Sequence, residues 1–248
     1  MKIKVLSINI HKGFSLFNRR FVLPQLRDAI HEVDADVVLL QEVVGENRRL
    51  EKKIDGWPAG TQLDFLAQGR WDHICYGKNA IYSHRHHGNA ILSKFPIVEH
   101  ENISLTNYRL EQRGLLHVQI KVPGYSWIFH VFNVHLDLTG ISRRKQIQKI
   151  IARAKKHVLP TEPFVLGGDF NDWTGETTPA LFEFLEVHEC FHRQRGSHAR
   201  SFPSFKPMLQ LDRLYFRSLN LHSAKTLENR PWSRLSDHLP IVVEFDLL

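Results

Sequence analysis

Recurring strand-like segments constrain the fold of this chain more than any other feature of the sequence. They are rich in Val, Ile, Leu and Phe, and they occupy residues 2–8, 37–40, 89–93, 115–121, 127–134, 164–167, 209–216 and 240–246. The first alternates polar and apolar residues, which predicts a half-buried strand. Others, such as VVLL at 37–40, are apolar throughout, which predicts strands that are covered on both faces or packed sheet on sheet.

Three longer segments between these strands predict helices. Apolar residues recur at helical spacing over residues 19–33, where Pro24 is tolerated only in the first turn, and again over residues 142–158 and 178–187. Helix 142–158 carries basic residues away from its apolar face. Runs of strands with interspersed helices predict an α/β fold in which two sheets form a β-sandwich with helices outside.

Length and composition favour one domain over residues 1–248. The chain is 42% hydrophobic, which suffices for one large core, and no linker, low-complexity tract or repeat interrupts it. Cys75 and Cys190 are too few for a disulfide framework and are expected to be buried or inert thiols in a reducing compartment. The first residues do not resemble a signal peptide, and no apolar run is long enough to span a bilayer. We therefore expect a soluble cytoplasmic monomer.

The formal net charge is +7 and the isoelectric point is about 9.5, which favours a polyanionic partner such as nucleic acid or an anionic membrane surface. The basic residues of helix 142–158 and of the region that contains Arg193, Arg195, Arg200 and Lys206 would supply the contacts.

Polar side chains stand at or near the ends of six of the predicted strands. They are carboxylates, amides and imidazoles, which bind metals and move protons, rather than the usual Lys, Ser and Gly of loops. The set consists of Asn9 and His11 after the first strand, Gln41 and Glu42 after the second, His135, Asp169 with Asn171, Asp212, and Asp237 with His238 in the SDHLP stretch at 236–240.

Two pairs in this set stand out from ordinary loop residues. Asp169 and Asn171 lie two positions apart in GGDFND, so extended backbone would direct both to the same side. Asp212 lies within the apolar stretch LQLDRLYF, where a carboxylate costs free energy unless it has a partner, and His238 is the obvious candidate. The HRHH stretch at 84–87 has poor spacing for a metal site and is expected to form a solvated basic loop.

Carboxylate, amide and imidazole groups without cysteine ligands suit a hard cation such as Mg²⁺ or Mn²⁺. An Asp next to an Asn can orient and deprotonate water, and an Asp–His pair can hold an imidazolium against a phosphate. The sequence has no G-x-S-x-G nucleophile motif. Metal-dependent hydrolysis of a phosphoester is the chemistry that uses every group.

The order of the motifs resembles the endonuclease/exonuclease/phosphatase superfamily, which has the four-layer DNase I-like fold. The motifs are SINIHKG at 7–13, LLQEV at 39–43, HGNAILSKFPI at 87–97, NVHLD at 133–137, GGDFND at 167–172, LDRLYF at 211–216 and SDHLPI at 236–241, and they span nearly the whole chain.

The resemblance implies a role for each matching residue. It implies that Glu42 is the main metal ligand, with Asn9 beside it and Asp237 as a second carboxylate on the metal side. Asp169 would position or deprotonate water with Asn171, His135 would contact phosphate, and Asp212 and His238 would act as a pair. Arg113 occupies a position where relatives hold a substrate-contacting Arg, and His11 is assigned to substrate binding.

Two departures from the abasic-site endonucleases of the superfamily affect the expected substrate. His11 replaces an acidic or amide residue, and His135 replaces a Tyr, which brings the chain closer to DNase I and the neutral sphingomyelinases. Cleavage of nucleic acid is the first prediction. The alternatives are a phosphatase or a phospholipase- or sphingomyelinase-like phosphodiesterase, and a non-catalytic binding module. The sequence shows no clear apolar hairpin for peripheral membrane contact. The stretch SFPSFKPML at 201–209 would touch an apolar group of the substrate if it lay near the site.

Overall fold

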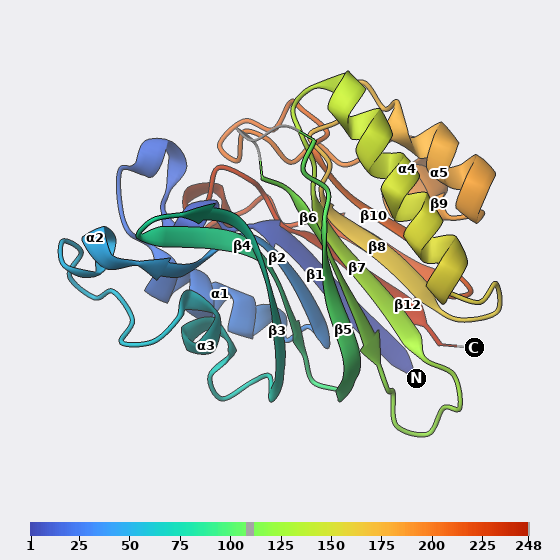
Figure 1. Ribbon diagram of the computed structural model, residues 1–248, viewed down its shortest axis with the longest axis horizontal. Coiled ribbons are helices and arrows are strands. Elements are labelled where there is room, and N and C mark those ends of the chain that lie inside the picture. The colour runs from blue at the N-terminus through green and yellow to red at the C-terminus, as the bar shows by residue number, and fades with distance from the viewer. Residues whose placement is uncertain (108–111, 248) are drawn as a thin grey trace.

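The computed structural model describes residues 1–107 and 112–247, and two six-stranded sheets pack face to face in it (Figure 1). The first sheet has the order β11–β12–β1–β2–β4–β3, with strands β1 (Lys2–Asn9), β2 (Val37–Asn47), β3 (His73–Tyr82), β4 (Arg85–Ser93), β11 (Asn220–Thr226) and β12 (Ile241–Asp246). The second has the order β5–β6–β7–β8–β10–β9, with strands β5 (Ile97–Ser104), β6 (Gly114–Ile120), β7 (Phe129–His135), β8 (Phe164–Asp169), β9 (His188–Glu189) and β10 (Asp212–Arg217).

Helices cover the outer faces of both sheets and complete four layers, which confirms the predicted fold class. The first sheet is covered by α1 (Leu23–Val33) and α3 (Gln62–Ala67), and the second by α4 (Gly140–His157) and α5 (Thr177–Leu185). The remaining helical segments are α2 (Arg48–Glu51), α6 (Cys190–Arg195), η1 (His11–Gly13), η2 (Leu16–Asn18) and η3 (Trp232–Arg234). No helix in the described part of the chain is both long and apolar enough to cross a lipid bilayer.

Burial on both faces explains why the interior strands are apolar throughout. Along β2, Val37 and Leu39 face the core between the two sheets, whereas Val38 and Leu40 pack under α1 and α3. On β7, alternate residues likewise face the central core and the layer beneath α4. Because side chains alternate along a strand, apolar residues are needed at every position when both faces are covered.

Two parallel strand pairs bring chain segments distant in sequence to one rim of the sandwich. β1 pairs with β2, and β7 pairs with β8, both in parallel. Since parallel strands end on the same side, the residues that follow all four strands lie at one edge. The antiparallel strand β10 begins at that edge, where Asp212 is directly opposite Asp169, and His135 is directly opposite Asp169 on the other side.

Three local expectations differ from the structure. Helix α1 begins at Leu23 rather than at residue 19, because Phe21 instead forms an isolated bridge with Phe14. Strand β2 continues beyond Leu40 to Asn47, past a register shift between Leu40 and Val43. The stretch at 84–87 is not a solvated loop, because its last three residues begin β4 and two of them are half-buried.

Candidate active site

Asp169, the last residue of β8, lies at the centre of the candidate site and is almost fully buried. Its Oδ2 atom accepts a hydrogen bond from Asn9 Nδ2 at 3.1 Å and lies 3.5 Å from His135 Nε2 and 3.7 Å from His238 Nε2. Its Oδ1 atom accepts a hydrogen bond from the backbone N–H of Asn171 at 3.0 Å. The Asp169 carboxylate therefore contacts side chains from both sheets, namely from β1 and β7, and from the segment that precedes β12.

The Asp212–His238 pair expected from the sequence is formed within hydrogen-bond distance. His238 Nδ1 lies 2.8 Å from Asp212 Oδ2, and both side chains are buried. Burial alone would lower the pKa of His238, but the carboxylates of Asp212 and Asp169 outweigh it and raise that pKa to about 10. The imidazole is thus a cation at neutral pH, and its Nε2 atom lies 3.7 Å from Asp169 Oδ2.

The same surroundings shift the proton affinity of Asp169 in the direction that suits a general base. Burial raises the pKa of Asp169, His238 lowers it, and Asp212 raises it again, with a net value of about 6. A carboxylate with a pKa near neutrality is ionised in neutral solution and is still basic enough to accept a proton from water.

Glu42 directly follows Gln41, the parallel partner of Asn9, and its Oε2 atom accepts a hydrogen bond from Lys12 Nζ at 2.6 Å. Burial would raise the pKa of Glu42, but the Lys12 ammonium holds it far below its ordinary value. The register shift in β2 is a bulge next to Glu42, and such bulges commonly re-aim a side chain beside an active site.

Left-handed backbone is concentrated at this rim. Of nine non-glycine residues with positive φ in the described chain, four are His11, Lys12, Glu42 and Asn171, with φ between 45° and 58°. Non-glycine residues pay roughly 1–3 kcal/mol for such conformations, which tend to cluster at functional sites. The fold therefore places these four side chains at a cost in stability.

Arg113 and His135 form a second contact pair at the rim. Arg113 Nη1 lies 2.9 Å from His135 Nε2, and Arg113 Nε lies 3.4 Å from Asp137 Oδ1. Because a guanidinium can only donate, Nε2 of His135 must be the acceptor, which assigns the neutral imidazole. Burial and the nearby Arg113 charge lower the pKa of His135 well below its usual value, in agreement with that assignment.

His11 and Asp237 lie together at the mouth, with His11 Nδ1 3.7 Å from Asp237 Oδ1. The backbone N–H of His11 donates to Asn9 Oδ1 at 3.0 Å, so the turn that places His11 also fixes the Asn9 amide. Asp172, which neighbours Asn171, does not belong to this set. Its carboxylate instead accepts hydrogen bonds from the first residues of α5, including Thr177 N at 2.9 Å.

A buried group of amides beneath the rim holds the two sheets in register. Gln41 Nε2 of the first sheet donates to Asn133 Oδ1 of the second at 2.8 Å. Asn133 Nδ2 donates to the carbonyls of Leu40 and Ala90, and Asn89 Nδ2 donates to that of Gly114 at 3.0 Å. These hydrogen bonds between the sheets position Glu42 and His135, which adjoin them in sequence or register.

Two rim residues were not singled out from the sequence. Lys12 contacts Glu42 directly. It could have been recognised from the sequence because it lies in the SINIHKG motif, three residues after Asn9. His87 is half-buried, and burial together with the Lys12 charge lowers its pKa to about 4, while Glu42 opposes that shift. Its signal was the spacing of two to Asn89, which directs both side chains to the same face of β4.

The residues fit a divalent cation at Glu42 better than at the Asp212–His238 pair. Asp169, Asp212 and His238 do bring potential ligand atoms within 4.8 Å of one another, but a cationic imidazole repels a metal ion. Glu42 is ionised and partly accessible, and within the described chain it forms an ion pair with the half-exposed Lys12 side chain. One firm carboxylate with room for water ligands is typical of a Mg²⁺ site.

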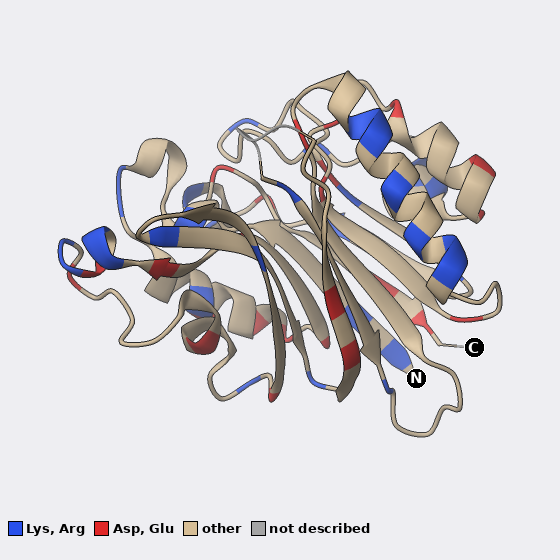
Figure 2. Cartoon of the chain, in the orientation of Figure 1, with Lys and Arg blue, Asp and Glu red and all other residues tan. Residues whose placement is uncertain are grey.

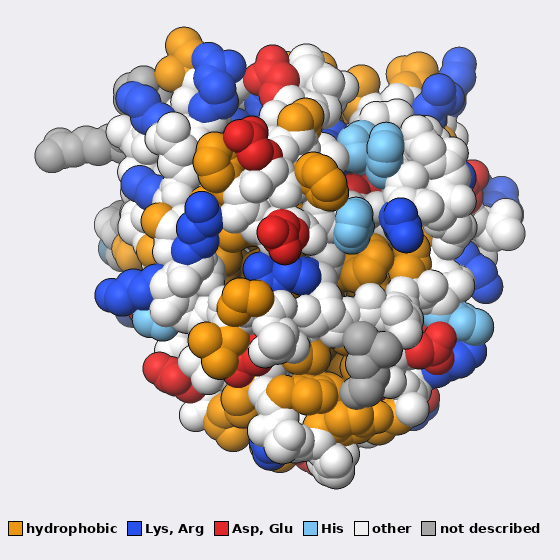
Figure 3. Space-filling model, turned by 90° about the vertical axis from the view of Figure 1, so that its right-hand side faces the viewer, with side chains coloured by type: hydrophobic (Ala, Val, Ile, Leu, Met, Phe, Trp, Pro, Cys, Tyr) orange, Lys and Arg blue, Asp and Glu red, His pale blue; other side chains and the backbone are white. Residues whose placement is uncertain are grey.

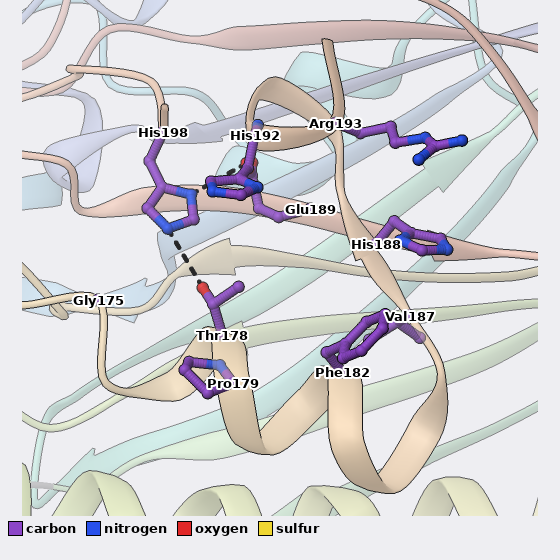
Figure 4. Close-up of a pocket in the computed structure, with 10 residues that line it drawn as sticks. All are labelled: Gly175, Thr178, Pro179, Phe182, Val187, His188, Glu189, His192, Arg193 and His198. Atoms are coloured by element: carbon purple, nitrogen blue, oxygen red, sulfur yellow. Dashed lines mark hydrogen bonds and ion pairs between the residues drawn. The ribbon is translucent and has the colours of Figure 1, made fainter. Parts of the chain in front are cut away.

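A separate hollow of about 640 Å³ lies between α5 and α6, on the outer side of the second sheet (Figure 4). His198 in its wall is already paired, with Nδ1 3.0 Å from Glu189 Oε2 and Nε2 3.3 Å from Thr178 Oγ1. The hollow is lined by other residues than the rim set, and it is therefore not the candidate active site.

The four-layer sandwich with carboxylates, amides and imidazoles at one rim defines a class of protein, and comparison with known families agrees. The model of the endonuclease/exonuclease/phosphatase family matches residues 6–238, and the chain belongs to this family. The name of the family spans enzymes that cleave phosphoester bonds.

A particular relative is the uncharacterized protein YbhP of Escherichia coli K12, which is 41% identical over 98% of this chain and 96% of its own length. An endonuclease/exonuclease/phosphatase from Beutenbergia cavernae has a TM-score of 0.78 at 20% identity, covering 99% of this chain and 72% of its own. A mannosyl-6-phosphatase from Bacteroides thetaiotaomicron has a TM-score of 0.73 at 17% identity, covering 99% of this chain and 100% of its own. The family model and the identity to YbhP confirm the family predicted from the motifs, and the two structures support the fold.

Proposed function

We propose that this protein is a divalent-metal-dependent hydrolase that cleaves a phosphoester, chiefly a phosphodiester, by attack of water. The observation that carries the proposal is the convergence on Asp169 of three groups from separate strand ends, namely Asn9, His135 and His238, with each contact at 3.1 to 3.7 Å. A non-catalytic binding module would not need a carboxylate of raised pKa beside a cationic imidazole.

The residues divide into groups that act on water and groups that act on phosphate. Asp169 accepts the proton of the attacking water, and Asn171, whose Nδ2 donates to the Leu136 carbonyl, borders the place where that water lies. His238, kept protonated by Asp212, stabilises the negative charge that develops on the phosphoryl oxygens. Arg113 and His11 would contact the remaining substrate oxygens.

Glu42 and Asn9 would hold Mg²⁺ or Mn²⁺. Asp237, which would be a second carboxylate on the metal side, lies beside His11 at the mouth. Such an ion neutralises phosphoryl and leaving-group oxygens. In its absence the Lys12 ammonium is the counter-charge of Glu42, so metal binding must displace that ammonium from the carboxylate.

Nucleic acid is the substrate favoured by the +7 charge, but the position of the basic residues weakens this prediction. Lys and Arg are spread along the whole length of α4 (Figure 2), and that helix runs from the rim toward the opposite end of β7 and β8. On the face shown in Figure 3, basic side chains are interspersed with acidic and apolar ones rather than gathered in a track. This disposition favours a lipid or small phosphoester as the second candidate.

The proposal is tested first through the metal. E42Q should weaken Mg²⁺ or Mn²⁺ binding at least about tenfold in calorimetry, because it removes the charged ligand while keeping the shape. K12M is the matched variant, and it should bind the metal more tightly, since no ammonium competes for Glu42. Full hydrolysis of a chromogenic phosphodiester in excess EDTA would refute metal dependence.

A further inference from the structure

A loop of apolar side chains is anchored directly beside the candidate site. Within residues 201–209, Phe202 and Leu209 form an antiparallel bridge that closes the loop. The backbone N–H of Ser204 donates to the Asp237 carbonyl at 2.8 Å, and that of Leu239 donates to the Ser201 carbonyl at 2.8 Å. The Phe202 ring centroid lies 5.0 Å from that of His238. The loop is thus held against the residues on both sides of His238.

The tip of this loop exposes large apolar side chains to solvent. Phe205 is 62% exposed, Met208 is 56% exposed and Leu209 is 39% exposed. Single exposed apolar residues are ordinary, whereas a contiguous group next to a site mouth marks an interaction surface.

The exposed apolar side chains continue along the rim to the residues that follow β8 and β7. Buried Arg213 donates to the carbonyls of both Asp172 and Gln210, so the segments that carry Trp173 and Leu209 approach each other. Arg143 lies over the Trp173 ring at 5.1 Å and donates to the Leu138 carbonyl at 2.6 Å. Trp173 and Leu138 are each 48% exposed. We name this set the mouth crescent; it consists of Leu138, Trp173, Phe205, Met208 and Leu209.

The charged residues within the loop segment are of one sign. Residues 200–211, RSFPSFKPMLQL, contain Arg200 and Lys206, both exposed, and no carboxylate. Apolar tips with basic neighbours match a bilayer whose headgroups are anionic, since the tips enter the acyl boundary and the cations meet the phosphates. Single-stranded nucleic acid fits less well, because base stacking requires aromatic faces and three of the five side chains are aliphatic.

We propose that the mouth crescent docks this protein on an anionic lipid surface and that the phosphoester it hydrolyses belongs to a lipid headgroup. This inference rests on the proposed function and names the substrate class for the same site. Docking through the crescent presents the rim, including Asp169 and His238, to the headgroup layer, where a phosphodiester enters without leaving the membrane.

Vesicle co-sedimentation tests the docking. The natural protein should bind vesicles of phosphatidylcholine with phosphatidylglycerol more tightly than vesicles of phosphatidylcholine alone. The double variant F205S/M208S should bind the anionic vesicles at least about tenfold more weakly, because two apolar side chains no longer enter the bilayer. The matched control is F182S/F184S, which alters two side chains of similar exposure on α5 and should leave binding unchanged.

A soluble substrate separates this inference from the proposed function. F205S/M208S should hydrolyse bis(p-nitrophenyl) phosphate with Mg²⁺ or Mn²⁺ as the natural protein does, yet lose at least about tenfold of its rate on vesicle phosphatidylglycerol. Equal vesicle binding by the crescent and control variants would overturn the docking, as would crescent-dependent binding of single-stranded DNA instead of vesicles. Absence of metal-dependent hydrolysis of the soluble diester would overturn the proposed function, whatever the vesicles show.

Discussion

At the scale of single residues, the site depends on opposing effects on proton affinity. Burial disfavours charge on both Asp169 and His238, and their mutual attraction together with Asp212 decides the outcome. The result is a carboxylate that is moderately basic beside an imidazole that stays cationic. Two groups whose pKa values are pushed apart in this way are suited to act as base and cation in one reaction.

Coupling between Asp212 and His238 follows from their 2.8 Å contact. H238A should lower turnover at least roughly a hundredfold, the usual scale for losing a group that stabilises the transition state. D212N should also lower turnover, because the imidazole loses its main counter-charge. The double variant should then be little slower than H238A alone. Kinetics of the four proteins measure this, and fully multiplicative losses would show that the two residues act independently.

The pH profile of kcat/KM should report the same two groups. Asp169 must be ionised to accept a proton, so activity should fall as the pH drops through about 6, where its pKa lies. His238 must be protonated, so activity should also fall as the pH rises through about 10. D212N should move the alkaline limb to lower pH. An alkaline limb that does not move in D212N would contradict the assignment of His238.

At the scale of secondary structure, the interior strands were predictable and the edge strands were not. All eight predicted segments correspond to strands inside the two sheets, whereas β3, β5, β9 and β11 lie at the four edges. Edge strands are less covered; β5, for example, is exposed or half-exposed at every position, so its sequence carries no apolar signal. The predicted site residues lie within, at the ends of or close to interior strands, which is why their sequence positions could be recognised. Lys12 and His87 also adjoin or belong to interior strands, but Lys is an ordinary loop residue and the HRHH stretch resembles a solvated basic loop, so the type of side chain did not mark them.

Strand β8 depends on the absence of a side chain at Gly168. Its φ is +135°, and a Cβ atom there would lie 2.0 Å from the Val134 carbonyl oxygen of the parallel neighbour. G168A should therefore destabilise the fold by about 3 kcal/mol or more in urea unfolding. Gly124 is the control, because its φ is also positive but nothing lies within 4 Å of its Cβ position. G124A should cost only about 1–2 kcal/mol, and equal losses would show that crowding is not the cause.

At the scale of the whole molecule, the distribution of charge matters more than the net value of +7. A nucleic-acid substrate is held by many phosphate contacts, and its affinity falls steeply with salt. On the face shown in Figure 3, Lys and Arg are dispersed among acidic and apolar groups, so we expect weak binding of DNA and RNA to this face even at low salt. The KM for a small soluble phosphodiester should change little between low and moderate salt. Tight DNA binding that is lost steeply over this range would restore the nuclease prediction.

The pairing of β1 with β12 also decides how the molecule can be attached to something else. Lys2 pairs with Asp246, so the two ends of the described chain leave the sandwich together (Figure 1), a full strand length from Asn9 and the rim. A fusion partner or solid support joined at either end would therefore hold the molecule by its base. The mouth of the candidate site would face outward, free to meet a surface in front of it.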